Sequence, residues 1–300
     1  QLNIASADFK VFAGHKEVGL FRTEGMYADR VPKMSDVVRS LKSSLLRAAG
    51  LTIRLFDPDD DKVRPEDAEK FAGKRGMGFL LETEAGSSIA REQIRALLIA
   101  VDRLATEGRV DLEKKEIRIL LPMLITAEQS AELRKRFNAI EAELLADKTI
   151  HCVRGEKIEF GAMIETASAV MNLEEITEES TSFSIGANDL TRDLLAISDR
   201  RLLMTGQRYD WLSPKVLRAI ERIIDVAKEK KIKVSCCGEI SRDPMGAILL
   251  TLMGIDALSM DASYIPDINY VLSHLHFDEW KKFARKDEDG KSKVEKALAK

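Results

Sequence analysis

The chain has 300 residues, of which 45% are hydrophobic and 32% are charged, so it can bury a sizeable core. Its formal net charge of −3 is too balanced to indicate a nucleic-acid or membrane partner, and no apolar run reaches the roughly 18 residues of a membrane span. Three cysteines, Cys152, Cys236 and Cys237, argue against a disulfide scaffold and favour a reducing, cytoplasmic setting.

Strands and helices alternate along most of the chain. Short apolar runs predict strands near 2–6, 18–24, 51–57, 78–84, 116–124, 159–166, 182–188 and 233–238. Amphipathic patterns predict helices over 34–49, 88–107, 127–147 and 214–231. Most of the strands are apolar on both faces, as parallel strands covered by helices are. Eight of them indicate an α/β fold of the (β/α)8 TIM-barrel type, and the absence of a glycine-rich phosphate turn argues against an open doubly wound sheet.

Two charged segments interrupt this pattern. The stretch 57–78 is long for a connection in a barrel, so we expect either a mobile loop over the barrel mouth or a disordered excursion. The segment 285–300 is rich in charge and poor in apolar residues. We therefore expect the barrel to span residues 1–284 and to be followed by a charged tail or a last helix.

Barrels of this kind carry their functional residues at the C-terminal ends of the strands. The predicted ends bring together arginines, carboxylates, an amide and a thiol: Arg22, Glu24, Arg54, Asp57, Glu82, Glu84, Glu165, Asn188, Asp189, Cys237 and Glu239. Guanidiniums bind carboxylates and phosphates, paired carboxylates hold Mg²⁺, and a thiol can move a proton at carbon. Together they predict a barrel enzyme acting on a small phosphorylated acid with Mg²⁺, although each residue alone fits an ion pair, a helix cap or a core position equally well.

Four segments then resemble the motifs of one enzyme family, in that family's order, across about residues 2–272. Residues 18–30, VGLFRTEGMYADR, resemble the G-[IL]-[GL]-L-x-R-T-E-x-x-[YF]-x-[DE]-R signature of phosphoenolpyruvate (PEP)-utilising enzymes. The others are AMIET at 162–166, FSIGANDLT at 183–191 and CCGE at 236–239, and GIDALSM at 254–260 continues into the last barrel segment. The likeness is greatest to the C-terminal PEP-binding domain of Enzyme I of the bacterial sugar phosphotransferase system. Pyruvate phosphate dikinase and PEP synthase resemble it less.

The resemblance implies a barrel of the phosphoenolpyruvate/pyruvate superfamily type that binds PEP and Mg²⁺ and forms a homodimer. By the matching motifs, Glu165 and Asp189 would ligate Mg²⁺. Cys237 would act as the catalytic acid that protonates C3 of the enolate as pyruvate forms.

The same resemblance implies a set of substrate-binding residues. Arg22 and Arg54 would hold the phosphate, and Asn188 would bind it partly through its backbone. Arg200 corresponds to a further substrate-binding arginine, shifted by one residue from the family's spacing.

The phosphoryl acceptor in the family is a histidine on a separate swivelling domain, which then serves a phosphocarrier protein. No segment of these 300 residues resembles that domain. We therefore expect the chain to bind PEP and to need a separate phosphohistidine domain for a complete transfer.

The match departs from the family around the phosphate. The family's R-T-x-D-x-G-G-D-K becomes RLFDPDDDK at 54–62, where Asp59 and Asp60 replace two glycines. An arginine in the family's L-G-W-R-x-x-R falls on Gly78, and the loss of one such contact should cost about 2–3 kcal/mol. Arg75, three positions earlier, is a candidate replacement, as is Arg200.

Three functions follow. The first is a working but divergent Enzyme I barrel. The second is a paralogue that keeps the fold and the metal site as a sensor or partner-binding module. The third is a Mg²⁺-dependent 2-oxoacid lyase. Retention of Cys237 favours an enzyme, whereas the missing arginine favours the sensor or partner-binding module. Of the three, we expect the divergent Enzyme I barrel.

Overall fold

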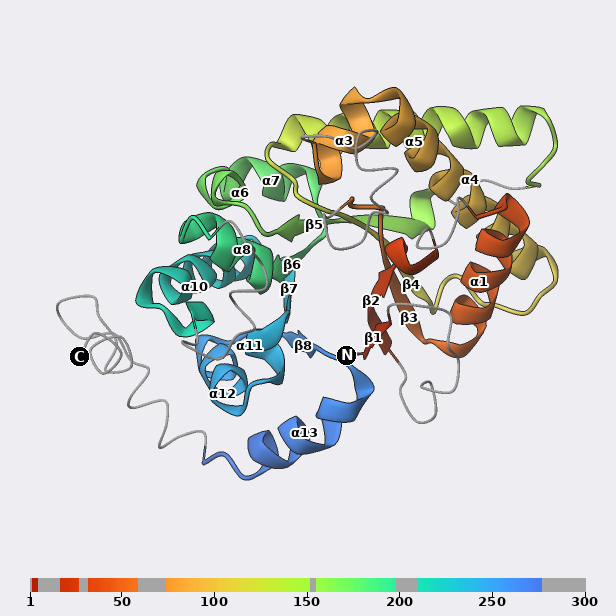
Figure 1. The fold of residues 1–300 in the computed structure, drawn as a ribbon. Coiled ribbons are helices and arrows are strands. Elements are labelled where there is room, and N and C mark those ends of the chain that lie inside the picture. Colours follow the sequence, from red (N-terminus) through yellow and green to blue (C-terminus); the bar gives the residue numbers. More distant parts are fainter. Residues whose placement is uncertain are drawn as a thin grey trace.

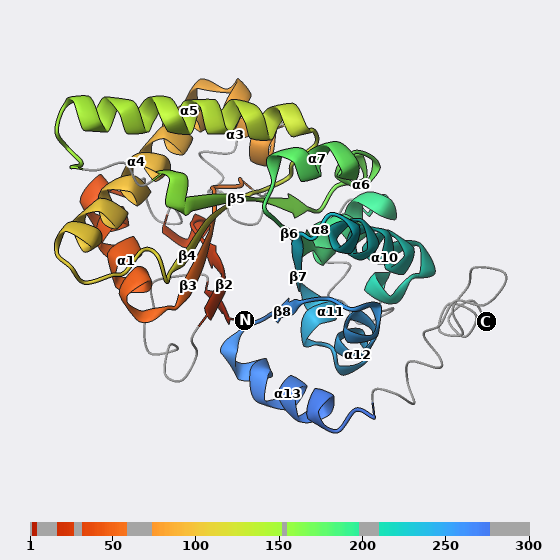
Figure 2. The ribbon, with the colours of Figure 1, turned by 180° about the vertical axis from the view of Figure 1, so that it is seen from behind.

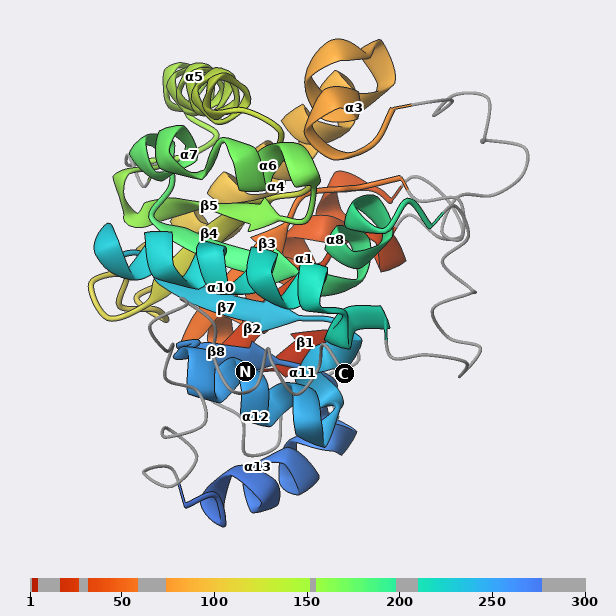
Figure 3. The same cartoon turned by 90° about the vertical axis from the view of Figure 1, so that its left-hand side faces the viewer.

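The computed structural model describes residues 2–4, 17–26, 32–58, 74–151, 155–197 and 210–276, and eight parallel strands in these ranges form one sheet. The strands pair in chain order: β1 (Leu2–Ile4), β2 (Glu17–Arg22), β3 (Gly50–Arg54), β4 (Glu116–Leu121), β5 (Ile158–Ile164), β6 (Ser182–Gly186), β7 (Lys233–Cys237) and β8 (Ala257–Ser259). In Figures 1 and 3, β8 returns to lie next to β1, so the sheet curls into a barrel. The predicted (β/α)8 barrel is confirmed.

Helices surround the strands on the outside of the barrel (Figure 2). They are α1 (Met34–Arg47), α3 (Gly76–Glu82), α4 (Glu84–Thr106), α5 (Ala127–Ala146), α6 (Ala167–Met171), α7 (Leu173–Glu179), α8 (Ala187–Leu194), α10 (Pro214–Glu229), α11 (Glu239–Arg242), α12 (Pro244–Met253) and α13 (Ile265–Ser273). Short 3₁₀ turns cover Glu24–Met26, Gly155–Lys157, Asp210–Leu212 and Ala262–Tyr264. Each of the four predicted helices is present, as α1, α4, α5 and α10. Within the described ranges, no helix combines the length and the apolar character needed to cross a membrane.

The core has an outer and an inner part. The outer part packs the helices against the strands and holds most of the buried apolar side chains, Cys236 among them. A much smaller cluster inside the barrel joins Leu20, Leu120, Met163 and Cys237, contributed by four different strands. Because neighbours on a strand point to opposite faces, Cys236 packs outward and Cys237 inward, as their adjacency predicted. Both have free thiols, and Cys152 lies outside the described residues.

The segment 78–84 is wrongly predicted as a strand, because residues Gly76–Glu82 form helix α3. Gly76 has a φ of 48°, and a Cβ there would lie 2.5 Å from the carbonyl oxygen of Pro122. This close approach turns the chain sharply into the helix, where Phe79 and Leu80 are fully buried. The eighth strand is β8, within the segment 254–260. Glu82 is consequently not at a strand end, and it instead pairs with Lys74 at 2.6 Å.

Some expectations concern residues outside the described ranges. Residues 59–73, including Asp59 and Asp60, belong to this group, as do the predicted boundary at 284 and the tail 285–300. The loop and tail therefore stay predictions.

Candidate functional site

A cavity of about 140 Å³ opens at the C-terminal ends of the strands. In Figure 3 the strand arrows point toward this end, where α8 and α11 also lie. The predicted residues that line the cavity are Arg22, Arg54, Glu165, Asn188, Asp189 and Cys237. The structure therefore brings together every residue to which the resemblance assigned a role, apart from Arg200, which lies outside the described ranges. Of the other predicted strand ends, Glu239 also lines the cavity, whereas Glu82 does not.

Two arginines form the cationic side of the cavity. Arg22 and Arg54 are register partners at the ends of β2 and β3, so their side chains leave neighbouring strands on the same face. Burial opposes the charge of Arg54, but the carboxylates of Glu24, Glu165 and Asp57 outweigh it and raise the pKa of Arg54. The buried Nε of Arg22 has no hydrogen-bond partner among the described residues. Two neighbouring guanidiniums of this kind suit an anion such as a phosphate.

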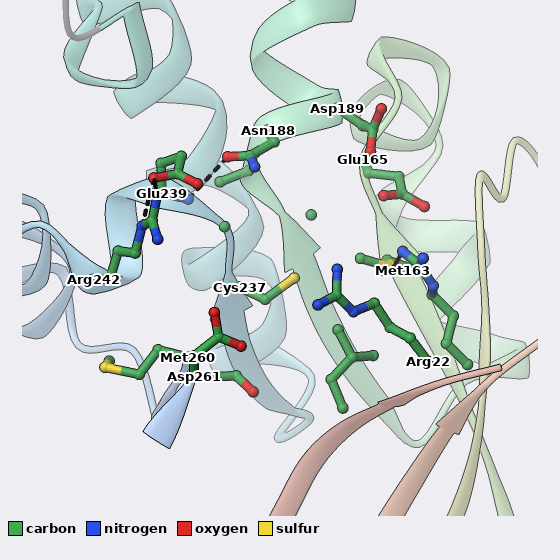
Figure 4. Close-up of a pocket in the computed structure, with 16 residues that line it drawn as sticks. Arg22, Met163, Glu165, Asn188, Asp189, Cys237, Glu239, Arg242, Met260 and Asp261 are labelled. Atoms are coloured by element: carbon green, nitrogen blue, oxygen red, sulfur yellow. Dashed lines mark hydrogen bonds and ion pairs between the residues drawn. The ribbon is translucent and has the colours of Figure 1, made fainter. Parts of the chain in front are cut away.

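Glu165 and Asp189 form the anionic side, and Figure 4 shows their side chains close together. Glu165 directly follows β5 and is fully buried. Its Oε1 accepts a hydrogen bond from the backbone N–H of Met123 at 2.8 Å, whereas Oε2 has no partner within the described residues. Burial, followed by the charge of Asp189, raises the pKa of Glu165 to about 8. The raised pKa favours the protonated form of this carboxyl.

The donor set fits a magnesium ion that is shared with a ligand. Across the described residues, no group of three or more His, Cys, Asp or Glu side chains is arranged to hold a metal. Mg²⁺, however, is commonly bound by one or two carboxylates together with waters and substrate oxygens. The orphaned Oε2 of Glu165 and its repulsion with Asp189 are the features that a divalent cation would relieve. Glu165 and Asp189 are thus the residues that would hold Mg²⁺.

Cys237 is the last residue of β7, opposite Gly186 of β6 and Ser259 of β8. Its sulfur points into the cavity (Figure 4). Burial, followed by the charge of Glu165, raises the pKa of the Cys237 thiol to about 11, although the two arginines act in the opposite direction. The thiol therefore keeps its proton at neutral pH and has the character of an acid rather than of a nucleophile.

Asn188 stands in the first turn of α8 and is fixed by the turn that follows β7. Its Oδ1 accepts a hydrogen bond from the backbone N–H of Glu239 at 2.9 Å. Gly238 has a φ of 105°, and a Cβ there would lie 2.7 Å from Asn188 Oδ1. The glycine of this turn thus allows the contact that orients the Asn188 amide. The amide nitrogen can then donate a hydrogen bond to a ligand.

Arg75 belongs to the site as well, although no motif contains it. Its Nη2 donates to Asp57 Oδ2 at 2.6 Å, and its Nη1 donates to Asp189 Oδ1 at 3.1 Å. A Cβ added at Gly78, where the motif resemblance led us to expect an arginine, would meet no heavy atom within 4 Å. The sequence indicated Arg75 only by its closeness to Gly78, and the structure places its guanidinium at the carboxylates.

Two further residues line the cavity that no sequence pattern indicated, Arg242 and Asp261. Arg242 Nε donates to Glu239 Oε2 at 2.5 Å, and its Nη1 donates to the Tyr264 hydroxyl at 2.8 Å. This small network fixes α11 to the turn before α13. A surface arginine three residues after a glutamate is too common a pattern to predict it.

Comparison with known proteins agrees with these observations. A family model described as "PEP-utilising enzyme, PEP-binding domain" matches residues 3–277. The multiphosphoryl transfer protein of Rhodobacter capsulatus is 32% identical over 95% of this chain and 32% of its own length. Phosphoenolpyruvate-protein phosphotransferases of Haemophilus influenzae and Haloferax volcanii are 30% and 31% identical, over 90% and 85% of this chain and 46% and 44% of theirs. The chain thus spans less than half the length of these relatives.

A solved structure shares the fold. The HpcH/HpaI aldolase from Desulfitobacterium hafniense DCB-2 superposes with a TM-score of 0.50 and 13% identity, covering 91% of this chain and 92% of that one. At this identity the likeness supports the barrel fold alone. The family match over nearly all described residues, together with the arginines, carboxylates and thiol of its motifs in one cavity, shows that the chain belongs to the family of PEP-binding domains of PEP-utilising enzymes, as a divergent member.

Proposed function

We propose that this chain binds PEP together with Mg²⁺ and supports transfer of the phosphoryl group to a histidine on a separate domain, with release of pyruvate. The proposal thus assigns the chain the PEP-binding part of a phosphoenolpyruvate-protein phosphotransferase. The observation that carries it is that the Cys237 thiol lines the same cavity as Arg22, Arg54, Glu165 and Asp189. One thiol therefore lies within electrostatic reach of both the phosphate-binding and the metal-binding groups.

Each wall of the cavity has a part in binding. Arg22 and Arg54 take the phosphate of PEP, and the amide of Asn188 adds a neutral donor beside them. Glu165 and Asp189 hold Mg²⁺, which when bound supplies positive charge to the oxygens of the ligand. Binding of the cation also replaces the proton that the isolated carboxyl of Glu165 keeps.

The chemical step moves a phosphoryl group and a proton. The bond between phosphorus and the enol oxygen of PEP breaks as phosphorus bonds to the imidazole nitrogen of the acceptor histidine, and the bond electrons stay on the oxygen as an enolate. C3 of the enolate then takes the proton of the Cys237 thiol, which gives pyruvate and a thiolate that is reprotonated from water. A thiol with a pKa near 11 still carries the proton when it is needed.

The acceptor lies on another domain or chain. Relatives named multiphosphoryl transfer protein and phosphoenolpyruvate-protein phosphotransferase support a phosphohistidine domain and a phosphocarrier protein as partners. We further propose a homodimer in the cytoplasm, in a pathway of sugar transport.

The first test is calorimetric titration of the chain with PEP and, separately, with oxalate, each with Mg²⁺ and with EDTA. Oxalate resembles the enolate of pyruvate and has no phosphate, so it reports on the metal half of the site alone. The proposal expects both ligands to bind and both to require Mg²⁺. Binding of oxalate without PEP would favour the sensor or the lyase instead, and a chain that binds neither would contradict a ligand site here.

A further inference from the structure

A second cavity, here called the lower cavity, lies inside the barrel at the opposite end from the candidate site. Its volume is about 250 Å³, against about 140 Å³ for the cavity of the candidate site, here called the upper cavity. Glu116 and Lys233, the first residues of β4 and β7, line it, so it opens away from the arrowheads of the strands in Figure 3. This end of a barrel ordinarily contributes to stability rather than to function.

One layer of apolar side chains separates the two cavities. It is the small inner cluster of Leu20, Leu120, Met163 and Cys237. Leu120 lines the lower cavity, whereas the other three line the upper one. A molecule in the lower cavity therefore does not reach the groups that we assign to PEP and Mg²⁺.

Small hydroxyl residues surround the lower cavity. Residues two apart on a strand point to the same face, so the residues two before those at the upper cavity also point into the barrel. In the lower cavity these include Thr52, Ser184 and Ser235, from β3, β6 and β7. Bulky branched side chains usually fill such a layer. The short hydroxyl side chains leave the space open and polar instead.

Arg118 of β4 brings a positive charge into this space, with a side chain that is only 14% exposed. Its Nε and Nη2 donate to Glu159 Oε2 at 3.0 and 2.6 Å, which fixes one edge of the guanidinium to β5. Its Nη1 contacts the Thr52 hydroxyl at 3.5 Å, a distance too long for a strong hydrogen bond. Nη1 therefore has donor capacity left beside the cavity.

Gly161 of β5 makes room for this arginine. A Cβ there would lie 2.6 Å from Ser182 Oγ and 3.0 Å from Arg118 Cδ. The hydroxyls near it are weakly engaged, since Ser235 Oγ reaches the carbonyl oxygen of Phe183 at 3.5 Å. Buried polar groups normally have good hydrogen-bond partners, so a polar molecule in the cavity would complete this set.

The charges around the lower cavity suit a ligand with a single negative charge. Arg118 lies near two carboxylates, those of Glu159 at 2.6 Å and Glu116 at 3.5 Å, and Lys233 pairs with Glu116 at 3.0 Å. Asp256 adds another carboxylate to the lining. These carboxylates would repel a phosphate dianion, whereas one carboxylate can accept hydrogen bonds from Nη1 of Arg118.

We propose that the lower cavity is a second ligand site, which binds a small hydroxycarboxylic acid. The carboxylate of the ligand lies at Arg118, and its hydroxyl groups bond to Thr52, Ser184 and Ser235. The lower cavity is the larger of the two, so it has room for an acid of three or four carbons. This inference does not depend on the proposed function.

The experiment is calorimetric titration of the chain with D-glycerate in EDTA. D-glycerate is the probe because it combines one carboxylate with two hydroxyl groups on three carbons. Glyceramide, in which an uncharged amide replaces the carboxylate, and inorganic phosphate are the control ligands. We expect D-glycerate to bind without a divalent cation, at least about 10-fold more tightly than either control.

Three variants locate the site. Arg118→Gln should lose about 10- to 100-fold in D-glycerate affinity, the range of one charge-assisted contact. Ser235→Val fills part of the lower cavity and keeps the pair of Arg118 with Glu159, so it should also lose affinity even if Arg118→Gln folds poorly. Arg22→Gln removes an arginine from the upper cavity and is the matched control, which should bind D-glycerate as wild type does.

Each outcome bears on the inference. Failure of wild type to bind D-glycerate at concentrations up to about 10 mM overturns it. Equal affinity for glyceramide or phosphate overturns the assignment to a carboxylic acid. An equal loss in Arg22→Gln and Arg118→Gln places the ligand in the upper cavity and also overturns it. None of these results touches Mg²⁺-dependent binding of PEP, so the proposed function stands or falls separately.

Discussion

The guanidinium of Arg54 donates from Nη2 to Glu24 Oε1 over 2.6 Å, and both side chains are only 5% exposed. The hydroxyl of Thr23 adds a hydrogen bond of 3.0 Å to the carbonyl oxygen of Arg54. The segment Arg22-Thr23-Glu24 thus supplies one guanidinium to the cavity and fixes the position of a second. This explains why the three residue types occur together: Thr23 and Glu24 act through Arg54 rather than through the ligand.

Replacing Glu24 should destabilise the fold. In Glu24→Ala, Arg54 keeps its charge in a buried place without its nearest carboxylate, and breaking such a buried pair costs about 3–5 kcal/mol. Urea unfolding measures the loss, and Glu24→Gln, which keeps a hydrogen-bond acceptor, should lose less. Glu107→Ala is the control, because it removes the exposed pair with Lys42 and should hardly move the unfolding midpoint. A similar shift in both alanine variants would contradict a special role for the buried pair.

Gly186 should not tolerate a side chain. A Cβ there would lie 2.4 Å from Glu165 Oε2 and 2.7 Å from Glu165 Cβ, so the carboxylate would have to move. We expect Gly186→Ala to lose Mg²⁺-dependent oxalate binding and about 1–3 kcal/mol of unfolding free energy, as overpacking does.

Gly78→Ala is the counterpart, since a Cβ at this position meets nothing within 4 Å and lies in α3. It should gain about 0.5–1 kcal/mol, because glycine disfavours helix, and keep oxalate binding. Calorimetry of the two variants measures oxalate affinity, and urea unfolding measures the unfolding free energy. Normal oxalate binding by Gly186→Ala would contradict the assignment of Glu165 as a metal ligand.

Sequence patterns predicted the barrel well where the elements are long. The helices α1, α4, α5 and α10 carry clear periodicity over many residues, and the strands β2 to β7 lie in short apolar runs between them. The error at 78–84 arose because a short apolar run fits a strand and a buried helix equally well. The strand that completes the sheet, β8, has three residues, which is too short for any periodic signal.

Site residues could be predicted from the sequence where they lie in motifs at the C-terminal ends of strands. Arg22, Arg54, Glu165, Asn188, Asp189 and Cys237 all follow that rule. Arg75 does not, because its reach depends on the turn at Gly76 and on the two oxygens of Asp57, which are tertiary features. The spacing of residues along the chain predicts neither the turn at Gly76 nor the contacts of Asp57.

The raised pKa of Glu165 makes stability depend on pH. This carboxyl has a pKa near 8 in the folded chain and near its ordinary 4.5 when unfolded, so folding takes up a proton between these values. Its contribution to the unfolding free energy is therefore present below pH 4.5 and is lost as the pH rises through about 8. Without metal, wild type should weaken across this range relative to Glu165→Gln, which has no such proton.

Urea unfolding in EDTA at several values between pH 5 and pH 9 tests this difference, with the variant as the reference at each pH. Mg²⁺ added at the alkaline end should stabilise wild type more than Glu165→Gln, because the cation replaces the missing proton. Parallel curves for the two proteins would mean that Glu165 is ionised throughout.

Cys237 should be needed for proton transfer at carbon and not for binding. We expect Cys237→Ala to keep its affinity for PEP, since the charged groups of the cavity are unchanged, but to stop the exchange of pyruvate methyl protons with D₂O that wild type catalyses with Mg²⁺. Cys236→Ala is the control, because that side chain packs in the outer core, away from the cavity. Proton NMR of the methyl signal measures the exchange rate of each variant. Undiminished exchange in Cys237→Ala would mean that another group transfers the proton. Exchange begins when the Cys237 thiolate removes a proton from the pyruvate methyl group, so a pKa near 11 predicts that the exchange rate of wild type still rises between pH 7 and pH 9, where that of an ordinary cysteine would level off.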